Sequence, residues 1–155
     1  MARPHAFRAK TELPLARERV FPFFADASNL EQITPPELRF RILTPLPIEM
    51  RQGTLIRYRL RLMGVPFEWL TRITLWDPPR EFVDEQVSGP YRRWIHQHLF
   101  VETSFGTRIH DAVTYELPLF PFGEIASPLV RLEVRRIFAY RSRALAKAFG
   151  VEDED

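Results

Sequence analysis

Regular alternation of polar and apolar residues, interrupted at short intervals by turn residues, is the feature that most constrains how this chain folds. From Thr54 onward the alternating segments are separated by Met63 to Pro66, Asp77 to Arg80, Ser88 to Pro90 and Thr103 to Gly106. A period of two is typical of strands with one buried and one solvated face. Short turns between such strands predict successive antiparallel hairpins.

The hairpins can be tested against one another, because directly opposed residues of an antiparallel pair share a face. Across the first turn we expect Leu62 to oppose Phe67, which sets Leu60 opposite Trp69, Tyr58 opposite Thr71, Ile56 opposite Ile73 and, on the other face, Arg61 opposite Glu68. The later turns predict the pairs Leu75–Phe82, Ile73–Asp84, Thr71–Gln86, Gln86–Trp94, Asp84–His96, Phe82–His98, Phe100–Ile109, His98–Asp111, His96–Val113 and Trp94–Tyr115. All four hairpins assign the same residues to one face.

That shared face is apolar and aromatic at its ends and polar in the middle. Buried carboxylates and imidazoles cost several kcal/mol unless they are paired or hydrated, so a plain packing core has no reason to collect them. Apolar walls with a few convergent polar groups are the ordinary composition of a small-molecule site. The candidate ligand-binding residues are Tyr58, Trp69, Asp84, Gln86, Trp94, His96, His98, Asp111 and Tyr115.

The segments on either side of the hairpins complete the fold. Residues 7–13 and 38–43 alternate like strands, while residues 15–25 and Ser28 to Ile33 predict two short helices that end before Pro35-Pro36. Residues from about 125 to 149 carry a helical apolar stripe that closes near Gly150. We therefore predict an α+β fold: a seven-stranded antiparallel sheet curved around a long C-terminal helix, with two short helices between strands one and two.

Length and composition exclude several classes of protein. The 155 residues fit one domain over residues 1–150, followed by an acidic tail over residues 151–155. The absence of cysteine excludes disulfides, thiolate metal sites and cysteine nucleophiles. A net charge of +2 is too small to argue for nucleic acid. No apolar run approaches the roughly 20 residues of a membrane span and no signal peptide is visible, so a cytoplasmic protein is expected.

The order of elements resembles the helix-grip fold of the START-like superfamily, also called SRPBCC, which includes polyketide cyclases and relatives of the birch pollen allergen. Trp76 to Asp84, Gly89 to Tyr91 and Trp94 to Phe100 resemble more closely a bacterial ligand-binding subgroup often labelled cell-division-inhibitor-like. The resemblance spans nearly the whole chain and is sharpest over residues 71–118. It implies a single START-like ligand-binding domain with a hydrophobic cavity between sheet and helix, but no particular substrate, because this scaffold hosts transport, sensing and catalysis.

Asp84, His96, His98 and Asp111 form the polar centre of the shared face and allow three interpretations. Two histidines and a carboxylate are a common metal-ligand set, but the cluster is also compatible with a polar patch that contacts a ligand or with a self-satisfying network. Because the register sets each aspartate across from a different histidine, we expect two separate hydrogen-bonded pairs and no metal or cofactor. No serine or cysteine nucleophile lies beside the cluster, so a hydrolase triad is not expected.

The leading hypothesis is a non-catalytic protein that binds or carries a small hydrophobic molecule such as a lipid, isoprenoid or polyketide. The alternative is an enzyme of the cyclase or dehydratase type that uses Asp84, His96, His98 and Asp111 for proton transfer. A third class is an interaction protein whose cavity is only a packing defect.

The last predicted helix carries a row of basic residues: Arg131, Arg135, Arg136, Arg141, Arg143 and Lys147. A solvated helix face is the simpler interpretation, and transient contact with a membrane is the functional alternative. Phe120-Pro121-Phe122-Gly123, just before this helix, is a candidate gate.

Overall fold

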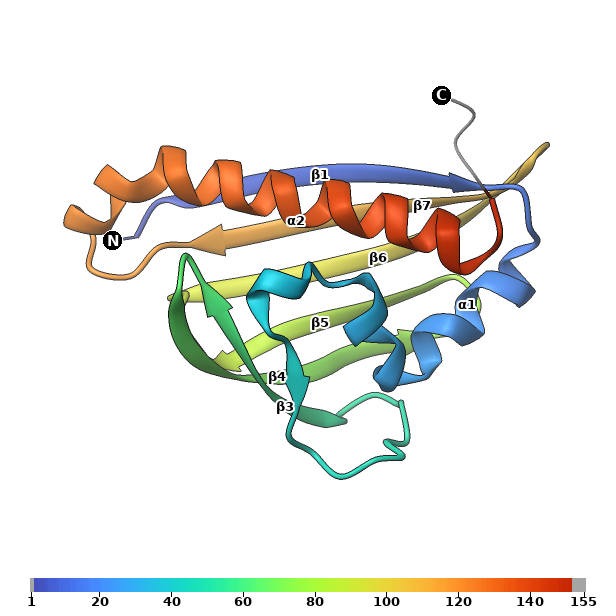
Figure 1. The fold of residues 1–155 in the computed structure, drawn as a ribbon, viewed down its shortest axis with the longest axis horizontal. Coiled ribbons are helices and arrows are strands. Elements are labelled where there is room, and N and C mark those ends of the chain that lie inside the picture. The colour runs from blue at the N-terminus through green and yellow to red at the C-terminus, as the bar shows by residue number, and fades with distance from the viewer. Residues whose placement is uncertain (1, 152–155) are drawn as a thin grey trace.

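A computed structural model describes residues 2–151 of the chain (Figure 1). The predicted tail, apart from Val151, lies outside the described residues. Seven strands, two α-helices and three 3-10 helices follow one another over this range: β1 (Pro4–Leu13), α1 (Arg17–Ala25), η1 (Ala27–Ile33), η2 (Pro36–Leu38), β2 (Arg41–Ile42), β3 (Leu55–Leu62), β4 (Val65–Asp77), β5 (Glu81–Ser88), β6 (Arg93–Thr103), β7 (Gly106–Glu116), η3 (Phe122–Ala126) and α2 (Ser127–Ala148).

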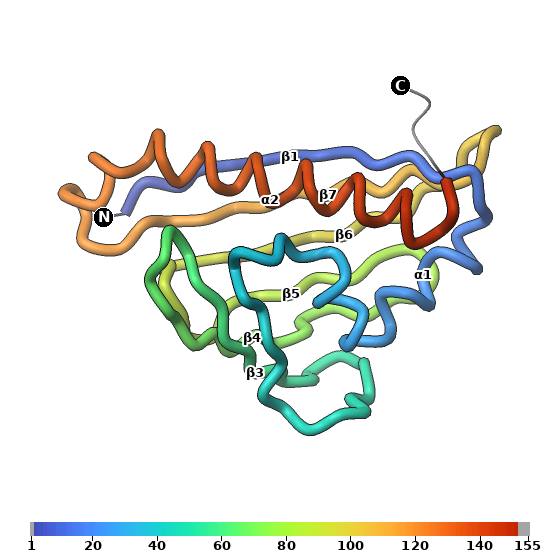
Figure 2. Tube along the Cα trace, viewed as in Figure 1, coloured from blue at the N-terminus to red at the C-terminus, as the bar shows by residue number. Residues whose placement is uncertain are grey.

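All seven strands form one antiparallel sheet in the order β1-β7-β6-β5-β4-β3-β2. In the ribbon and tube views α2 runs lengthwise over β1 and β7, while α1, η1 and η2 cover the other part of the same face (Figures 1 and 2). This arrangement confirms the predicted sheet, the long C-terminal helix and the helical segment between strands one and two.

The helix α2 is held by an apolar stripe and a glycine stop. Val130, Val134, Phe138 and Leu145 are its buried residues, at spacings of four, four and seven that keep them on one face. Gly150 ends the helix with a φ of 71°, and its amide donates to the carbonyl of Lys147, as expected for a C-terminal glycine. None of the helices among residues 2–151 is long and apolar enough to cross a membrane.

The region around Pro35-Pro36 differs from the prediction. Pro36 opens an additional 3-10 turn, η2, because proline is tolerated at the first helical position. The predicted strand over residues 38–43 shrinks to Arg41–Ile42, since Leu38 belongs to η2.

The predicted register of the β3–β4 hairpin is wrong by two residues. Leu62 pairs with Val65 and Tyr58 with Trp69, because Met63 and Gly64 make a two-residue turn with φ values of 50° and 80°. Arg59 rather than Arg61 therefore opposes Glu68. Positive φ at both central residues is the hairpin geometry that matches strand twist. A shift of two residues preserves the face, so Tyr58 and Trp69 still point toward α2.

Two further register predictions fail for local reasons. An irregularity between Ile73 and Leu75 pairs Leu75 with Val83 instead of Phe82, as a bulge adds one residue to β4. The β5–β6 ladder ends at Glu85, so Gln86 does not pair with Trp94. The remaining predicted pairs are confirmed: Ile73–Asp84, Thr71–Gln86, Asp84–His96, Phe82–His98, His98–Asp111, His96–Val113, Phe100–Ile109 and Trp94–Tyr115.

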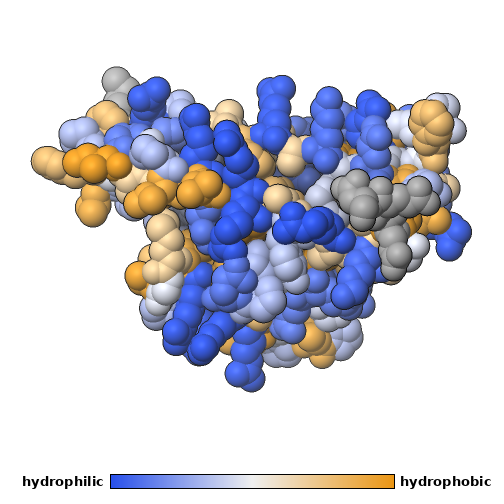
Figure 3. All heavy atoms as spheres, turned by 45° about the horizontal axis from the view of Figure 1, so that its top comes forward, coloured by the Kyte–Doolittle hydropathy of each residue, from blue (hydrophilic) through white to orange (hydrophobic). Residues whose placement is uncertain are grey.

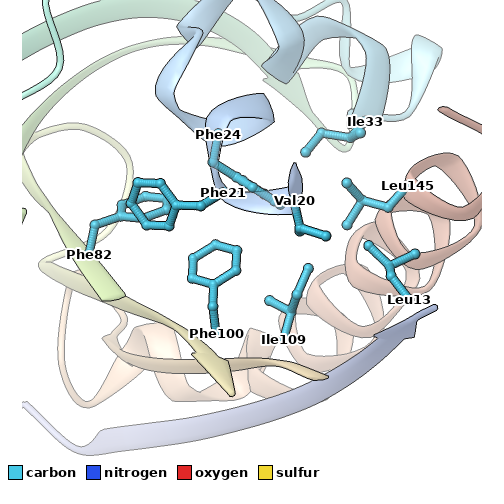
Figure 4. Close-up of a cluster of buried hydrophobic side chains, with 9 residues drawn as sticks. All are labelled: Leu13, Val20, Phe21, Phe24, Ile33, Phe82, Phe100, Ile109 and Leu145. Carbon is cyan, nitrogen blue, oxygen red and sulfur yellow. The ribbon is translucent and has the colours of Figure 1, made fainter. Parts of the chain in front are cut away.

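Two packed clusters occupy the ends of the space under the helices. At one end Phe21 and Phe24 of α1 pack against Phe82 and Phe100 of the sheet, with Leu145 of α2 beside them (Figure 4). At the other end Val113, Tyr115 and Leu117 of the sheet side pack against Val130, Val134 and Phe138 of α2. The polar middle of the inner face lies between these two clusters.

Candidate functional site

A cavity of about 130 Å³ lies between the inner face of the sheet and α2. Aromatic and aliphatic side chains make most of its wall, including Val134, Ile137 and Phe138 of α2. Six of the nine predicted site residues line it: Tyr58, Trp69, Asp84, Trp94, His96 and His98. The His96 ring lies 5.2 Å from the Phe138 ring, which confirms that the polar cluster faces the helix.

The other three predicted residues lie outside the cavity wall. Gln86 closes the β5–β6 turn, where its amide donates to the Tyr91 carbonyl at 2.7 Å and accepts from the Tyr91 N–H at 3.1 Å. Tyr115 is buried and stacks on His5 with ring centroids 5.2 Å apart. Asp111 is buried behind the histidines. Whether any of the nine contacts a ligand stays a prediction.

The cluster pairs each aspartate with a different histidine, as expected, but the hydrogen bonds run diagonally. His96 Nε2 lies 2.7 Å from Asp111 Oδ1, and His98 Nε2 lies 2.6 Å from Asp84 Oδ2. The directly opposed atoms are farther apart: His96 Nδ1 is 3.8 Å from Asp84 Oδ2. The reason is that the two imidazoles stack with centroids 3.6 Å apart, which turns the Nε2 edge of each ring toward the diagonal carboxylate.

Charge in the cluster is carried by the aspartates. Burial alone would raise the pKa of Asp84, but the His98 hydrogen bond and the electrostatic effect of the neighbouring His96, His98 and Arg141 side chains hold it below its usual value. Burial would also raise the pKa of Asp111, but its hydrogen bond with His96, together with the electrostatic effect of His96, His98 and Arg141, holds that pKa below its usual value. Both carboxyls are therefore ionised at neutral pH.

His98 is neutral at neutral pH. Burial, followed by the charge of His96, lowers the pKa of His98 to about 4 in spite of its bond to Asp84. With Nε2–H donating to Asp84, the other ring nitrogen, Nδ1, is an acceptor. It lies 3.5 Å from Asp111 Oδ1, which is also an acceptor, and has no hydrogen-bond partner within residues 2–151. An unused acceptor thus lies on a cavity-lining ring.

Two buried hydrogen-bond donors of cavity-lining residues, Trp69 Nε1 and Arg141 Nε, also lack a partner within residues 2–151. An unpaired buried polar atom costs about 1–3 kcal/mol, so each such atom calls for an explanation. Tyr58 adds a hydroxyl to the same wall, and burial together with the charge of Asp84 raises its pKa, so it stays protonated.

Sequence analysis overlooked Arg141, which we had placed on the solvated basic face of the last helix. The guanidinium instead lines the cavity and lies 5.1 Å from the centre of the Phe138 ring. A signal was present, because Arg141 follows Val134 by seven residues and Phe138 by three. This spacing places it on the buried stripe of the helix.

Asp84, His96 and His98 also bring three potential metal-ligating atoms within 4.8 Å of one another. Asp84 Oδ2 and His98 Nε2 are only 2.6 Å apart, whereas two ligands of one tetrahedral zinc lie roughly 3.3–3.5 Å apart. In the observed geometry this pair shares a proton, and one side chain must turn before both could ligate an ion.

Comparison with models of protein families identifies the family of this chain. A family model described as a domain of unknown function, DUF8410, matches residues 30–149, which is most of the chain. The chain belongs to this DUF8410 family. Among curated proteins, no sequence matches it significantly. All of the cavity residues described above, from Tyr58 to Arg141, fall inside the DUF8410 match.

Solved structures similar to this DUF8410 chain are helix-grip proteins. The protein TTHA0849 from Thermus thermophilus is 23% identical with a TM-score of 0.67, over 93% of this chain and 99% of that one. Major latex-like protein 151 from Panax ginseng is 10% identical with a TM-score of 0.65, over 94% and 97%. Norcoclaurine synthase from Thalictrum flavum, solved with dopamine and hydroxybenzaldehyde, is 12% identical with a TM-score of 0.70, over 99% and 91%.

At these identities the likeness shows the fold alone, and it confirms the predicted helix-grip fold. The closer resemblance to the cell-division-inhibitor-like subgroup stays a prediction.

Proposed function

We propose that this DUF8410 protein binds, and carries, a small hydrophobic molecule bearing one polar group, in the cavity between the sheet and α2. The observation that carries the proposal is a set of three buried polar atoms without a hydrogen-bond partner among residues 2–151, Trp69 Nε1, His98 Nδ1 and Arg141 Nε, which belong to side chains that line a mainly aromatic and aliphatic cavity. A ligand that pairs with them removes the cost of leaving them unsatisfied. Helix-grip proteins typically bind hydrophobic ligands in this position, which supports the same function.

The cavity volume favours a compact ligand. An engineered apolar cavity of about 150 Å³ holds one benzene molecule, so a cavity of about 130 Å³ suits a single ring or a short branched chain. Sites for larger molecules have volumes of roughly 300–1,000 Å³. A complete lipid, isoprenoid or polyketide would therefore need α2 and the short helices to move away from the sheet.

The polar atoms indicate which chemical group the ligand carries. Trp69 and Arg141 donate hydrogen bonds, while His98 Nδ1 and the Asp84 carboxylate accept them. A hydroxyl group can satisfy both kinds of partner, and a carbonyl can satisfy the donors. A phenol, an alcohol or a ketone on an apolar body is the ligand class that best fits this wall.

The cyclase or dehydratase alternative rests on one specific observation, the Asp84–His98 pair at the cavity wall with a free ring nitrogen. A general base works best when its pKa lies near the operating pH. The pKa of His98, lowered to about 4 by burial and by His96, makes the ring a weak base at neutral pH. Binding therefore ranks above proton transfer as the function of this pair.

Native mass spectrometry of the purified protein, followed by solvent extraction, tests the proposal. We expect a co-purified small molecule that is lost when Ile137→Trp fills the cavity. Ala139→Trp, on the exposed side of α2, is the matched control and should retain the molecule. Circular dichroism establishes that both variants fold. If the molecule still co-purifies with the Ile137→Trp variant, it binds outside the cavity and the proposal is wrong.

A further inference from the structure

The segment that joins β7 to α2, together with the first turns of α2, exposes an unusual number of large apolar side chains. Six of them, exposed by between 43% and 82%, form what we call the apolar patch: Leu119, Phe120, Phe122, Ile125, Leu129 and Leu132. Figure 3 shows apolar residues gathered at the end of the molecule where α2 begins. Single exposed apolar residues are normal, but a contiguous group marks an interaction surface.

The patch is built into the fold. Gly123 approaches Pro118 so closely that an added Cβ would collide with the Pro118 carbonyl oxygen, and its amide donates to the Leu119 carbonyl at 2.9 Å. Glu124 ties η3 to β1 through a 2.8 Å contact with the buried His5. The side chains are thus presented by a segment that is anchored at both ends.

The beginning of α2 is apolar on two sides. Val130 and Val134 face the sheet, while Leu129 and Leu132 are exposed. The first pair supplies the packing against the sheet, whereas Leu129 and Leu132 are 60% and 62% exposed. These exposed leucines extend the apolar surface of the preceding loop onto the first turns of the helix.

Five exposed arginines lie at the same end of the molecule as the patch, and we call them the arginine collar: Arg3, Arg92, Arg93, Arg131 and Arg135. The topology places them at this end, because Pro4 and Arg93 both pair with Glu116, the last residue of β7. The acidic residues nearby already have partners among residues 2–151: Glu124 with His5, Glu133 with Arg136, and Glu116 with Arg93. Arg93 of the collar is thereby paired with Glu116, and the other four arginines leave this end of the molecule with a net positive charge beside the apolar patch.

We propose that the apolar patch inserts into the surface of a lipid bilayer that contains anionic lipids, with the arginine collar at the level of the headgroups. An apolar face with a basic border is the arrangement that binds such surfaces. A second copy of the chain fits less well, since a two-fold contact through the patch would bring each collar against the same collar of its partner. The inference stands independently of the cavity ligand, and it moves the expected membrane contact from the basic stripe of α2 to the loop before it.

Sedimentation with vesicles tests this inference with the intact protein. We expect binding to vesicles of phosphatidylcholine mixed with phosphatidylserine, weaker binding to phosphatidylcholine alone, and a loss of binding as salt screens the arginines. Phe122→Glu should weaken binding by about tenfold or more, because it removes an inserted ring and adds a repelled charge. Arg135→Gln should weaken it by about fivefold on the anionic vesicles only.

Phe105→Glu is the matched control. Phe105 is 87% exposed, but it lies in the β6–β7 turn at the opposite end of β7, so its change should leave vesicle binding intact. Equal loss in both glutamate variants, or no binding to anionic vesicles at low salt, would overturn the inference. It would also fail if sedimentation equilibrium found a dimer that Phe122→Glu dissociates, since the patch would then be an interface between copies.

Discussion

Replacing His98 by glutamine should flatten the dependence of stability on pH between about 6.5 and 4. Burial and the charge of His96 lower the pKa of this imidazole from 6.5 to about 4, whereas the unfolded chain titrates at the ordinary value. Between the two values the unfolded chain binds a proton that the native protein does not. The free energy of unfolding therefore falls as the pH is lowered through this window.

The size of the effect follows from the shift. One proton per molecule changes the free energy of unfolding by about 1.4 kcal/mol per pH unit, so the full window is worth roughly 3 kcal/mol. Asp84 and Asp111 act in a different range. Their pKa values are depressed below 3.8, so their contribution is complete above that value and is lost only as the pH falls through their native pKa. Of these three groups only His98 titrates above pH 4, and comparison with the His98→Gln variant separates its contribution from that of Glu133, whose pKa burial raises above 4.5.

Urea unfolding followed by tryptophan fluorescence at several pH values measures this slope. The glutamine amide can still donate to Asp84 but does not titrate, so the His98→Gln variant should lose the slope. His110→Gln, which pairs on the outer face of β7 with Lys10, is the matched control and should keep it. A wild-type stability that is constant from pH 7 to 5, or a His98→Gln variant with an unchanged slope, would refute the reasoning.

Four other outcomes are expected. Trp69→Phe should leave the free energy of unfolding within about 0.5 kcal/mol of wild type in urea titrations, since its N–H has no partner, yet weaken binding of a hydroxylated ligand by about 1 kcal/mol. Leu145→Ala, at a side chain 1% exposed, should cost about 2–5 kcal/mol in the same assay. Gly106→Ala should cost more than about 1 kcal/mol, because φ is 149° and the new Cβ would meet the Leu13 carbonyl. Elemental analysis should find no stoichiometric metal in protein purified without chelator, and zinc that disappears on His98→Ala would contradict this.

The sequence predicted which residues share the inner face, but not how each one is paired. Alternation determines the face, and a register error of two residues leaves the face unchanged, so Tyr58 and Trp69 were placed correctly by a wrong register. The error arose at Met63, because a non-glycine residue rarely adopts the positive φ that a two-residue turn requires. The bulge after Ile73 was not predicted, because the sequence has no glycine or proline there to indicate an irregularity.

Within the site, the composition of the cluster was predictable and its internal geometry was not. Each aspartate does bind a different histidine, but the stacking of His96 on His98 selects the diagonal partners. Side-chain stacking depends on rotamers, which alternation does not encode. Arg141 was overlooked because a charged residue on a helix with many arginines is usually solvated. From the sequence, only Phe120 to Gly123 in the region of the apolar patch was singled out, as a candidate gate. The exposure of the patch could not be predicted, because it depends on how α2 packs on the sheet.

The indole N–H signals of the three tryptophans in a ¹⁵N-edited NMR spectrum test the central claim most directly. Trp69 and Trp94 line the cavity, while Trp76 packs beside Phe21 in the end cluster and serves as the internal control. On titration with 4-methylphenol, a single-ring phenol, we predict saturable shifts of the Trp69 and Trp94 signals, no shift of Trp76, and no response in the Ile137→Trp variant. Unmoved signals at the solubility limit of the phenol, or shifts that persist when the cavity is filled, would contradict a ligand site between the sheet and α2.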